Sequence, residues 1–246
     1  MVRSLLMVKR GTVKRVILKL SGDLFSDDDE RISFAAYDRV AKRIIKIVDK
    51  TKVEMVIVVG GGNIFRGRQV KKMKVDRSEA DTMGMLATII NGTGLREALV
   101  RRGREDTRLM TAVEMPEVGE PYLRVKARHH LRQGRIVIIG GGLGRPFFTT
   151  DSAVAQYATE LKCDLVLKAS TVDGVYEKDP KEHPEAKKYE ELDFQEALVK
   201  DLKIMDATAF AMCREQELPV IVFNIKDLDK LPDMLNGKLK LGTKIK

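Results

Sequence analysis

Three glycine-bearing segments of this chain have the composition of phosphate-binding turns. They are KLSGD at residues 19–23, GGGNIFRGR at 60–68 and GGGLGRPFFTTDS at 140–152. Glycine lets a backbone N–H approach an anion without a Cβ in the way, and a helix that begins behind such a turn adds partial positive charge. Lys19, Arg66 and Arg145 add full charges. One such segment alone would fit a plain tight turn as well as a phosphate site. Three such segments with basic residues nearby predict phosphate binding.

Five short aliphatic runs predict the strands that would position these turns. The runs lie at residues 16–18, 56–59, 136–139, 165–167 and 220–223. They are nearly continuous rather than alternating, which is typical of strands covered on both faces in a largely parallel sheet. Ligands bind outside the carboxyl ends of such strands, where the three glycine segments fall.

Helical patterns lie between these runs. Residues 36–49 and 84–100 carry apolar side chains at helical spacing, and residues 193–202 begin at Asp193 as an N-cap. Alternating strands and helices predict an α/β fold, a three-layer α/β/α sandwich with a largely parallel central sheet. The polar stretch at 177–191 predicts a surface loop.

The composition bounds the class of protein. The 246 residues carry 45 Lys and Arg against 36 Asp and Glu, and the net charge of +9 suits an anionic partner but equally a solvated cationic surface.

Cys163 and Cys213 form no metal-ligand spacing with the histidines, which argues against zinc and favours two buried cysteines in a reducing compartment. We find no signal peptide or membrane-length apolar run, and expect a cytoplasmic protein without a membrane partner. We also expect one domain over residues 1–246, with a weak boundary near 140–150.

The common nucleotide-binding fingerprints are missing from the sequence. The nearest approach to a GxxxxGK[ST] P-loop runs from Gly62 to Gly67 and continues with Arg68 and Gln69 instead of Lys and Ser or Thr. No GxGxxG follows a predicted strand, and no local cluster of Asp and Glu indicates a metal site. The P-loop ATPase, Rossmann and protein-kinase interpretations therefore fail at their fingerprints.

Six segments that occur in one order resemble the bacterial uridylate kinases of the amino acid kinase family. They are KLSGD, VVGGGNIFRG, ADTMGMLATIINGTGLREAL, GRPFFTTDSA, VLKASTVDGVYEKDPK and KIMDATAFAMCRE, and the likeness runs from about residue 13 to the C-terminus. GGGNIFRG together with PFFTTDSA is highly specific, whereas DGVY followed by DP marks only the wider family. The resemblance implies an amino acid kinase-like fold. It also implies a phosphotransferase that converts ATP and UMP to ADP and UDP in pyrimidine nucleotide (CTP) biosynthesis, with Mg²⁺ accompanying ATP.

The resemblance implies that a C-terminal lobe, about residues 151–246, binds ATP. The implied ATP-binding residues are Lys19, Leu20, Ser21, Gly22, Gly62, Arg66, Ser170, Tyr176 and Asp179. Ser170 keeps the hydroxyl of a more common threonine, and Tyr176 with Asp179 would hold adenine and ribose.

The same resemblance implies that an N-terminal lobe, about residues 13–150, binds UMP. The implied residues are Gly61, Asp81, Leu143, Gly144, Arg145, Pro146, Phe147, Phe148, Thr149 and Thr150. Asp81 would accept hydrogen bonds from the ribose, cap a helix, or do both. Phe147 and Phe148 are equally consistent with core residues. Leu143 and Arg145 replace the usual Thr and Asn, so uracil recognition would rest more on the main chain.

Phosphoryl transfer requires alignment and charge neutralisation more than covalent chemistry. The implied catalytic residues are Lys19, Arg66, Lys168, Asp151 and Asp206. Lys19 would contact the transferred phosphoryl group and Lys168 the ATP phosphates, although each could instead be a plain strand-end lysine. Arg66 would clamp phosphate with its fork of donors. Asp151 would orient a lysine or approach magnesium, and Asp206 would cap a helix or orient a lysine rather than bind metal. The magnesium ligands stay unassigned, and no general base is expected because the UMP phosphate is already an anionic nucleophile.

The resemblance also bears on partners, since it implies a homohexamer built from dimers and UTP as a candidate feedback inhibitor. Four acidic residues at 27–30 would repel a triphosphate, which argues against activation by GTP, or they form a solvated acidic turn. A carboxylate or carbamate acceptor is an alternative within the family. A nucleic-acid binder is another, but no helix-turn-helix or RNA-binding signature supports it.

Overall fold

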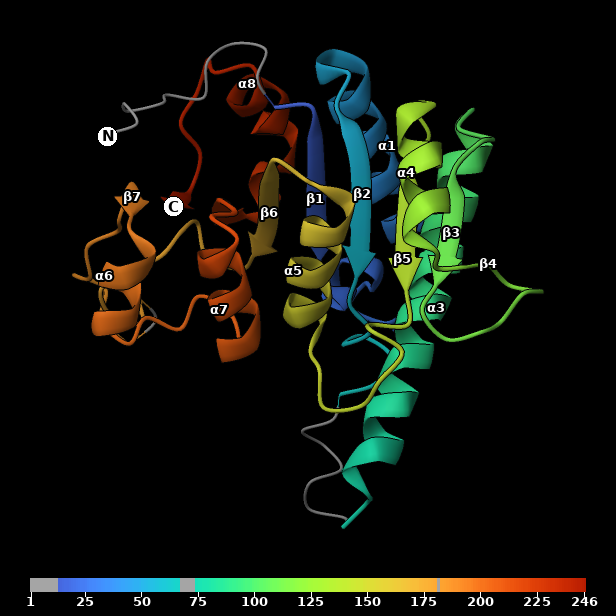
Figure 1. Cartoon of the computed structure of the whole chain (residues 1–246), viewed down its shortest axis with the longest axis horizontal. Coiled ribbons are helices and arrows are strands. Elements are labelled where there is room, and N and C mark those ends of the chain that lie inside the picture. The colour runs from blue at the N-terminus through green and yellow to red at the C-terminus, as the bar shows by residue number, and fades with distance from the viewer. Residues whose placement is uncertain (1–12, 67–73, 181) are drawn as a thin grey trace.

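The computed structural model describes residues 13–66, 74–180 and 182–246 (Figure 1). Its strands are β1 (Arg15–Leu20), β2 (Glu54–Val59), β3 (Arg108–Thr111), β4 (Glu120–Pro121), β5 (Val137–Gly140), β6 (Leu165–Ser170), β7 (Glu191–Leu192), β8 (Val220–Asn224) and β9 (Thr243–Ile245). Its α-helices are α1 (Phe34–Thr51), α3 (Arg77–Arg101), α4 (Arg124–Arg132), α5 (Thr150–Leu161), α6 (Phe194–Val199), α7 (Ala207–Glu215) and α8 (Leu231–Leu235), and its 3₁₀ helices are η1 (Gly22–Phe25) and η3 (Ile225–Lys230). The five predicted runs lie in β1, β2, β5, β6 and β8, apart from Ile136, which directly precedes β5.

The strands form one sheet in the order β4-β3-β5-β2-β1-β6-β8-β9-β7. The pairs that join β5, β2, β1, β6 and β8 are parallel, and the β8–β9 pair is the one antiparallel pair among the described strands. The prediction of a largely parallel central sheet is confirmed. Figure 1 shows β1, β2, β5 and β6 pointing their carboxyl ends toward the same edge, at the bottom of the view.

Helices cover both faces of this sheet, which confirms the predicted three-layer arrangement (Figure 1). One core lies between the sheet and α1, α3 and α8, and includes Ile44 and Leu95. The second core lies between the sheet and α4, α5 and α7, and includes Leu161. Within β1, Leu18 packs into the first core and its neighbour Ile17 into the second. Burial on both faces therefore explains why the strand sequences are continuously apolar.

The predicted helices are present, with ends that depend on their capping residues. α1 begins after Ser33, whose hydroxyl accepts a hydrogen bond from the Ala36 amide. α3 begins well before the predicted residue 84, because Asp76 caps its first turn. α6 begins after Asp193, whose carboxylate accepts two amide hydrogen bonds in the first turn, so the predicted N-cap is confirmed.

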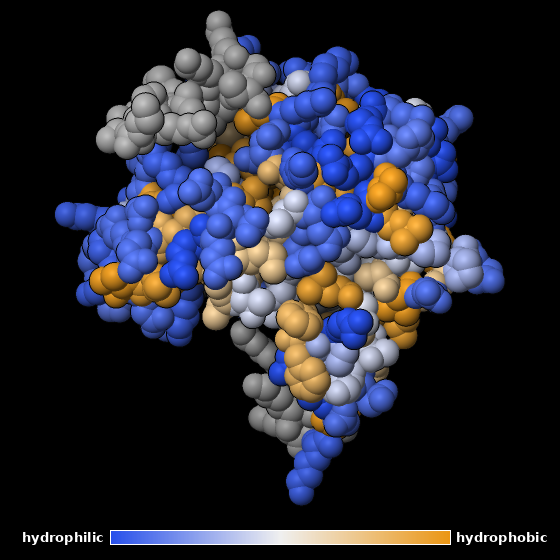
Figure 2. All heavy atoms as spheres, in the orientation of Figure 1, coloured by the Kyte–Doolittle hydropathy of each residue, from blue (hydrophilic) through white to orange (hydrophobic). Residues whose placement is uncertain are grey.

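Several predictions concern exposure to solvent. The described residues of the polar stretch are mostly exposed and irregular up to β7, as predicted for a surface loop. Cys163 and Cys213 are buried and unpaired, also as predicted. No helix in the described ranges combines the length and the apolarity needed to cross a membrane. The face in Figure 2 is largely hydrophilic with several separate apolar areas, one of which lies over α6, where Leu198 and Val199 are exposed.

Candidate active site

The turns after β1 and β2 interlock at the carboxyl edge of the sheet. A Cβ at Gly22 would lie 2.5 Å from the backbone nitrogen of Gly62 and 2.6 Å from Oδ1 of Asn63. A Cβ at Gly61 would lie 2.8 Å from Cβ of Ala87 in α3, whereas a Cβ at Gly62 would meet no described atom within 4 Å. The glycines therefore let two turns and a helix pack in direct contact, and the side of Gly62 where a side chain would stand faces open space.

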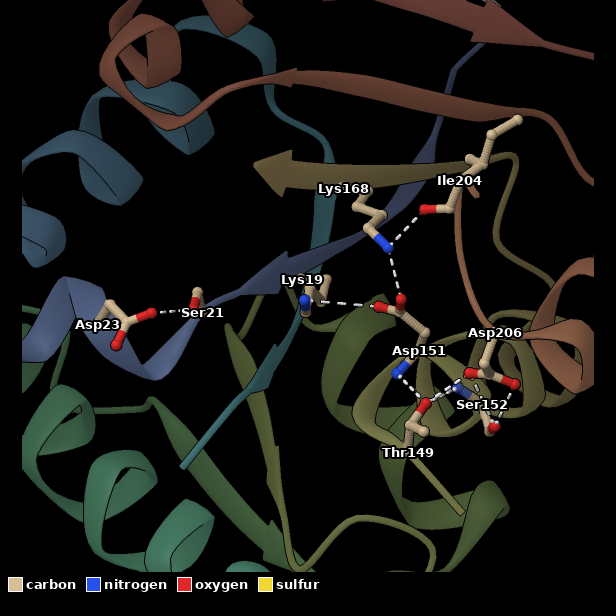
Figure 3. Close-up of polar contacts among 9 residues, drawn as sticks. All are labelled: Lys19, Ser21, Asp23, Thr149, Asp151, Ser152, Lys168, Ile204 and Asp206. Atoms are coloured by element: carbon tan, nitrogen blue, oxygen red, sulfur yellow. Dashed lines mark hydrogen bonds and ion pairs between the residues drawn. The ribbon is translucent and has the colours of Figure 1, made fainter. Parts of the chain in front are cut away.

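Two lysines lie side by side next to these turns. Lys19 of β1 and Lys168 of β6 are paired in register on adjacent parallel strands, so their side chains emerge on one face. Asp151, in the first turn of α5, lies between them: its Oδ1 is 3.5 Å from Lys19 Nζ and its Oδ2 forms an ion pair with Lys168. Lys168 Nζ also donates a 2.7 Å hydrogen bond to the Ile204 carbonyl. Figure 3 shows the three charged groups converging.

These three side chains are largely removed from solvent. The exposed fractions are 18% for Lys19, 13% for Lys168 and 16% for Asp151. Lys19 is therefore not the exposed strand-end lysine that the sequence left open as an alternative. Two cations on neighbouring strands repel each other at this burial, and one carboxylate offsets part of that repulsion. We call Lys19, Asp151 and Lys168 the lysine–aspartate group.

Asp206 fixes the start of two helices at once (Figure 3). It is the N-cap of α7, where Oδ1 accepts a 3.0 Å hydrogen bond from the Ala209 amide. Its carboxylate also accepts hydrogen bonds from the hydroxyls of Thr149, at 2.5 Å, and Ser152, at 3.0 Å. Thr149 is itself the N-cap of α5 and accepts from the Asp151 amide at 3.0 Å. Among the described residues we find no ion pair between Asp206 and a lysine, so its contact with the lysine–aspartate group runs through α5.

The Asp206 carboxyl is ionised at neutral pH. Burial raises the pKa of this carboxyl, but hydrogen bonds from Thr149, the Ala209 amide and Ser152 lower it, and the balance is a pKa below the usual value. The predicted capping role of Asp206 is confirmed by its contacts.

Arg66 lies at the open side of the Gly62 turn. Its Nε donates a 2.9 Å hydrogen bond to the Gly62 carbonyl and its Nη2 donates one of 2.5 Å to Asp23. The side chain is more than half exposed. Residues 67 and 68 of the same glycine segment lie outside the described residues. Arg66 is thus a largely exposed cation that is paired with the Asp23 carboxylate.

The acidic residues 27–30 form an exposed turn. The backbone amide of Asp27 donates to the Glu30 carbonyl at 3.0 Å, and the Glu30 amide donates back at 3.2 Å. Asp27 also accepts a 2.5 Å hydrogen bond from Ser33 and pairs with Arg39. These two hydrogen bonds hold the pKa of Asp27 below its usual value. The solvated acidic turn offered as an alternative by the sequence is confirmed, and the turn borders the cavity that Arg66 also lines, of about 370 Å³.

Asp81 lies inside α3 and not at its start. The cap is Asp76, so the helix-capping alternative for Asp81 is wrong. Its Oδ2 accepts a 2.7 Å hydrogen bond from the Phe147 amide and forms an ion pair of 2.9 Å with Arg77. Asp81 therefore ties α3 to the loop at 143–150.

The two phenylalanines of that loop are not core residues. Phe147 is 62% exposed and Phe148 46% exposed, so the core alternative is wrong for both. The physical reason is position, because the loop crosses the open edge of the sheet between β5 and α5, beyond both cores. Phe147 also adopts a φ of 72°, which a non-glycine residue occupies at an energetic cost.

The remaining loop residues have distinct positions. Gly144 has a φ of 69°, and a Cβ there would lie 2.5 Å from the Ala112 carbonyl oxygen, so this site requires glycine. Leu143 and Arg145 line a cavity of about 350 Å³ on the outer side of α5. Thr150 is the first residue of α5, and Pro146 lies between Arg145 and Phe147 in the same loop.

A third cavity, of about 450 Å³, lies against β6. The residues proposed from the resemblance that line it are Lys168, Ser170, Tyr176 and Asp179, and Leu202, Ile204 and Val222 are among its other lining residues. The structure therefore brings together four positions that the sequence placed in one nucleotide site. Lys168 belongs both to this cavity and to the lysine–aspartate group, and so connects the cavity to the glycine turns.

Sequence reasoning missed two groups that hold this site together. Ser152 and the Ile204 carbonyl bind Asp206 and Lys168, respectively. A serine after TTD indicated only a helix start, and no sequence signal marks a backbone carbonyl. The described residues also contain no group of three or more His, Cys, Asp or Glu that could hold a metal ion.

Comparisons with known proteins place this chain among the kinases that it resembles in sequence and in fold. The family model described as Amino acid kinase family matches residues 14–224. The chain is 41% identical to a uridylate kinase of Corynebacterium efficiens over 95% of both chains. Among solved structures it is similar to a UMP kinase from Bacillus anthracis, with 40% identity, a TM-score of 0.90, and coverage of 95% of this chain and 96% of that one. It is also similar to a UMP kinase from Ureaplasma parvum, with 37% identity, a TM-score of 0.88, and coverage of 95% and 98%.

Proposed function

The chain belongs to the amino acid kinase family, and we propose on this premise that it transfers the γ-phosphoryl group of ATP to UMP, giving ADP and UDP. UDP is the precursor of the further pyrimidine nucleotides, including CTP. The observation that carries the choice of UMP is the 41% identity to a uridylate kinase over 95% of the chain. The site geometry supports the reaction type, because two cations stand between an open glycine turn and a nucleotide-sized cavity.

The proposed donor site is the cavity against β6 in the C-terminal lobe, about residues 151–246. The adenine base packs against Tyr176, and the hydroxyl of Ser170 and the carboxylate of Asp179 contact the rest of the nucleoside. Lys168 reaches the phosphates from the inner end of the cavity. The backbone of Leu20, Ser21, Gly22 and Gly62 offers the remaining phosphate contacts along the carboxyl edge of β1 and β2.

The proposed acceptor site lies in the N-terminal lobe, about residues 13–150. Asp81 binds the ribose of UMP, and the loop at 143–150 surrounds the base. Gly61 contacts the UMP phosphate and Gly62 the ATP phosphates, and Arg66 clamps phosphate where the two nucleotides meet after exchanging its Asp23 partner for it. Arg66 is suited to this exchange because its side chain is more than half exposed.

Transfer itself relies on position and charge. Lys19 binds the phosphoryl group in the transition state of the transfer, in which negative charge is spread over three oxygens. Asp151 holds both lysines so that they aim at the same point without rearrangement during the reaction. Asp206 keeps α5, and with it Asp151, in place. The UMP phosphate attacks as an anion, so no side chain has to remove a proton.

Magnesium fits as a companion of the nucleotide. Mg²⁺ is commonly held by one or two carboxylates together with substrate phosphates, and the site offers the single carboxylate of Asp151, already engaged by two lysines. The ion would neutralise charge on the ATP phosphates, and most of its ligands would be phosphate oxygens and water.

The activity should decline at alkaline pH through Lys168. Burial, and secondarily the charge of Lys19, lower the pKa of Lys168 from 10.5, although Asp151 opposes this. The charged form is the one that binds phosphate, and a lowered pKa means that it is lost at a lower pH than for a free lysine. We expect kcat to fall as pH rises, with a midpoint below 10.5.

The check is the pH profile of kcat for the wild type and for Lys168→Arg. An arginine stays charged throughout this range, so whatever its activity at neutral pH, its alkaline decline should move to higher pH. An unchanged midpoint in the arginine variant would assign the decline to another group.

The proposed reaction is tested by ADP release across a panel of acceptors. UMP, CMP, dUMP and AMP are compared with acetylglutamate, aspartate and carbamate, each with and without GTP and UTP. We expect UMP to exceed every other acceptor by about 100-fold or more in kcat/KM. Turnover of a carboxylate or carbamate instead of UMP would place the chain elsewhere in the family. Activation by GTP would contradict the repulsion expected from residues 27–30.

The cellular setting and assembly are part of the proposal. A kinase of free nucleotides acts in the cytoplasm. We also expect a homohexamer built from dimers, in which another copy of the chain could cover the exposed apolar side chains of Met83, Leu86 and Ile90, which lie at helical spacing on α3. UTP is the candidate feedback inhibitor. Sedimentation of the purified chain tests the assembly.

A further inference from the structure

The aromatic wall of the donor cavity is held from behind by a charged pair. The Tyr176 hydroxyl donates a 2.5 Å hydrogen bond to Oδ1 of Asp173, and Lys188 Nζ lies 2.9 Å from Oδ2 of the same carboxylate. Tyr176 lines the donor cavity, whereas Asp173 and Lys188 do not. We call Asp173, Tyr176 and Lys188 the tyrosine clasp.

Lys188 reaches this carboxylate from the far end of the polar surface loop. Its backbone forms an isolated antiparallel bridge with Tyr176. Its aliphatic stem crosses Gly174, where a Cβ would lie 2.9 Å from Lys188 Cδ. The turn at 173–176 is also fixed from β9, since the Val175 amide donates a 2.8 Å hydrogen bond to Thr243 Oγ1. Backbone and side-chain contacts therefore both join the two ends of the loop at Tyr176.

The charge states of the clasp are stable around neutral pH. The Tyr176 hydrogen bond, followed by that of Lys188, holds the pKa of Asp173 below its usual value. The same hydrogen bond to Asp173 raises the pKa of Tyr176 above 10.0. The carboxylate loses its charge only when pH falls through a pKa already below 3.8, and the phenol loses its proton only when pH rises above 10.0. Asp173 thus accepts and Tyr176 donates over the whole range between.

We propose that Asp173 and Lys188 are positioning residues for the nucleoside triphosphate: Lys188 holds Asp173, and Asp173 holds the Tyr176 ring in the orientation that packs against the purine base. This rests on the proposed function, in which the cavity against β6 binds ATP. A tyrosine has free rotation about two side-chain bonds, and the clasp removes that freedom before the nucleotide arrives, which strengthens binding without adding a contact. Neither positioning residue touches the phosphates, so the transfer step is unaffected.

The test is a split between kinetic constants in three variants. Tyr176→Phe keeps the ring and removes the hydroxyl, Asp173→Asn removes the charge, and Lys188→Met keeps the stem over Gly174 and removes the amine. Each should raise KM for ATP by about three- to tenfold, the loss expected for one hydrogen bond. Both kcat and KM for UMP should stay within about twofold of wild type.

A control and a coupling measurement sharpen this result. Lys240→Met removes an exposed ion pair with Glu190 in the same region without touching Tyr176, and should leave KM for ATP unchanged. Tyr176→Phe combined with Asp173→Asn should weaken ATP no further than either change alone, because both break one hydrogen bond. Additive losses, or a fall in kcat with unchanged KM for ATP, would overturn the proposal.

A binding measurement separates this proposal from the assignment of the acceptor. Titration of ATP into wild type and variants, with no acceptor present, should show the same three- to tenfold loss of affinity. If UMP is not phosphorylated but ATP binding weakens as described, the acceptor assignment fails and the clasp stands. If UMP is phosphorylated and ATP affinity is unchanged in all three variants, the clasp fails and the acceptor assignment stands.

Discussion

Lys19→Ala should lower kcat by about 100- to 1,000-fold while leaving the affinity for UMP within about threefold of wild type. The physical reason is that the ammonium binds charge that develops only as the phosphoryl group leaves ATP. Lys19 lies on β1 and its side chain is only 18% exposed. In the alanine variant, solvent therefore compensates poorly for the missing positive charge. Steady-state kinetics give kcat, and calorimetric titration gives the UMP affinity.

Lys14→Ala is the matched control for this prediction. Lys14 directly precedes β1 and carries the same charge, but its side chain is 77% exposed and its ion-pair partner is Glu54, away from the site. Its kcat should equal that of the wild type. A loss of UMP affinity in Lys19→Ala as large as its loss of turnover would show that Lys19 binds the ground state, and would contradict the proposed role.

Asp151→Asn should lower kcat by about 100-fold through misplacement of Lys19 and Lys168. Both lysines contact this carboxylate and stand in register on adjacent strands, so removing its charge leaves two largely buried cations to repel each other. The same repulsion should lower the melting temperature of the free protein. Bound ATP should restore more stability in the variant than in wild type, because its phosphates supply the missing negative charge.

Thermal unfolding with and without ATP measures the melting temperature of Asp151→Asn and the stabilisation that ATP gives it. Asp233→Asn is the control, because it removes an equal charge from an exposed position on α8, which covers the face of the sheet opposite α5. If Asp151→Asn keeps full activity, or if ATP stabilises it no more than wild type, then Asp151 does not hold the lysines for catalysis.

The sequence predicted those parts of the fold whose signal is local. The central strands are continuous aliphatic runs because both faces are buried, so β1, β2, β5, β6 and β8 could be located in advance. α4 could not, because it buries only Ala127, His130 and Leu131 and exposes Val125, which gives no regular apolar stripe. The four-residue strand β3 and the still shorter β4, β7 and β9 also lack a distinctive pattern.

The candidate site, like the fold, has parts that the sequence predicted and parts that it did not. Glycine turns and strand-end lysines could be identified because residue type alone suits them to phosphate. The capping role of Asp81 was wrong because another acidic residue, Asp76, stands earlier in the same helix, and only the hydrogen bonds distinguish them. The link from Asp206 to Thr149 spans 57 positions, and it depends on how α5 and α7 pack rather than on any local pattern.

The register between β1 and β6 has a consequence for how this protein could change. Because Lys19 and Lys168 are register partners, their separation follows the spacing of hydrogen-bonded strands, about 4.8 Å, which loop substitutions do not alter. The segments proposed to select the base and the sugar, at 143–150 and 173–179, lie beyond the strand ends. Loops accept substitution and insertion far more readily than a central sheet does. The molecule thus separates a reaction centre fixed by strand pairing from recognition segments in loops, and a directed-evolution library aimed at new acceptors should vary the loops and leave β1 and β6 untouched.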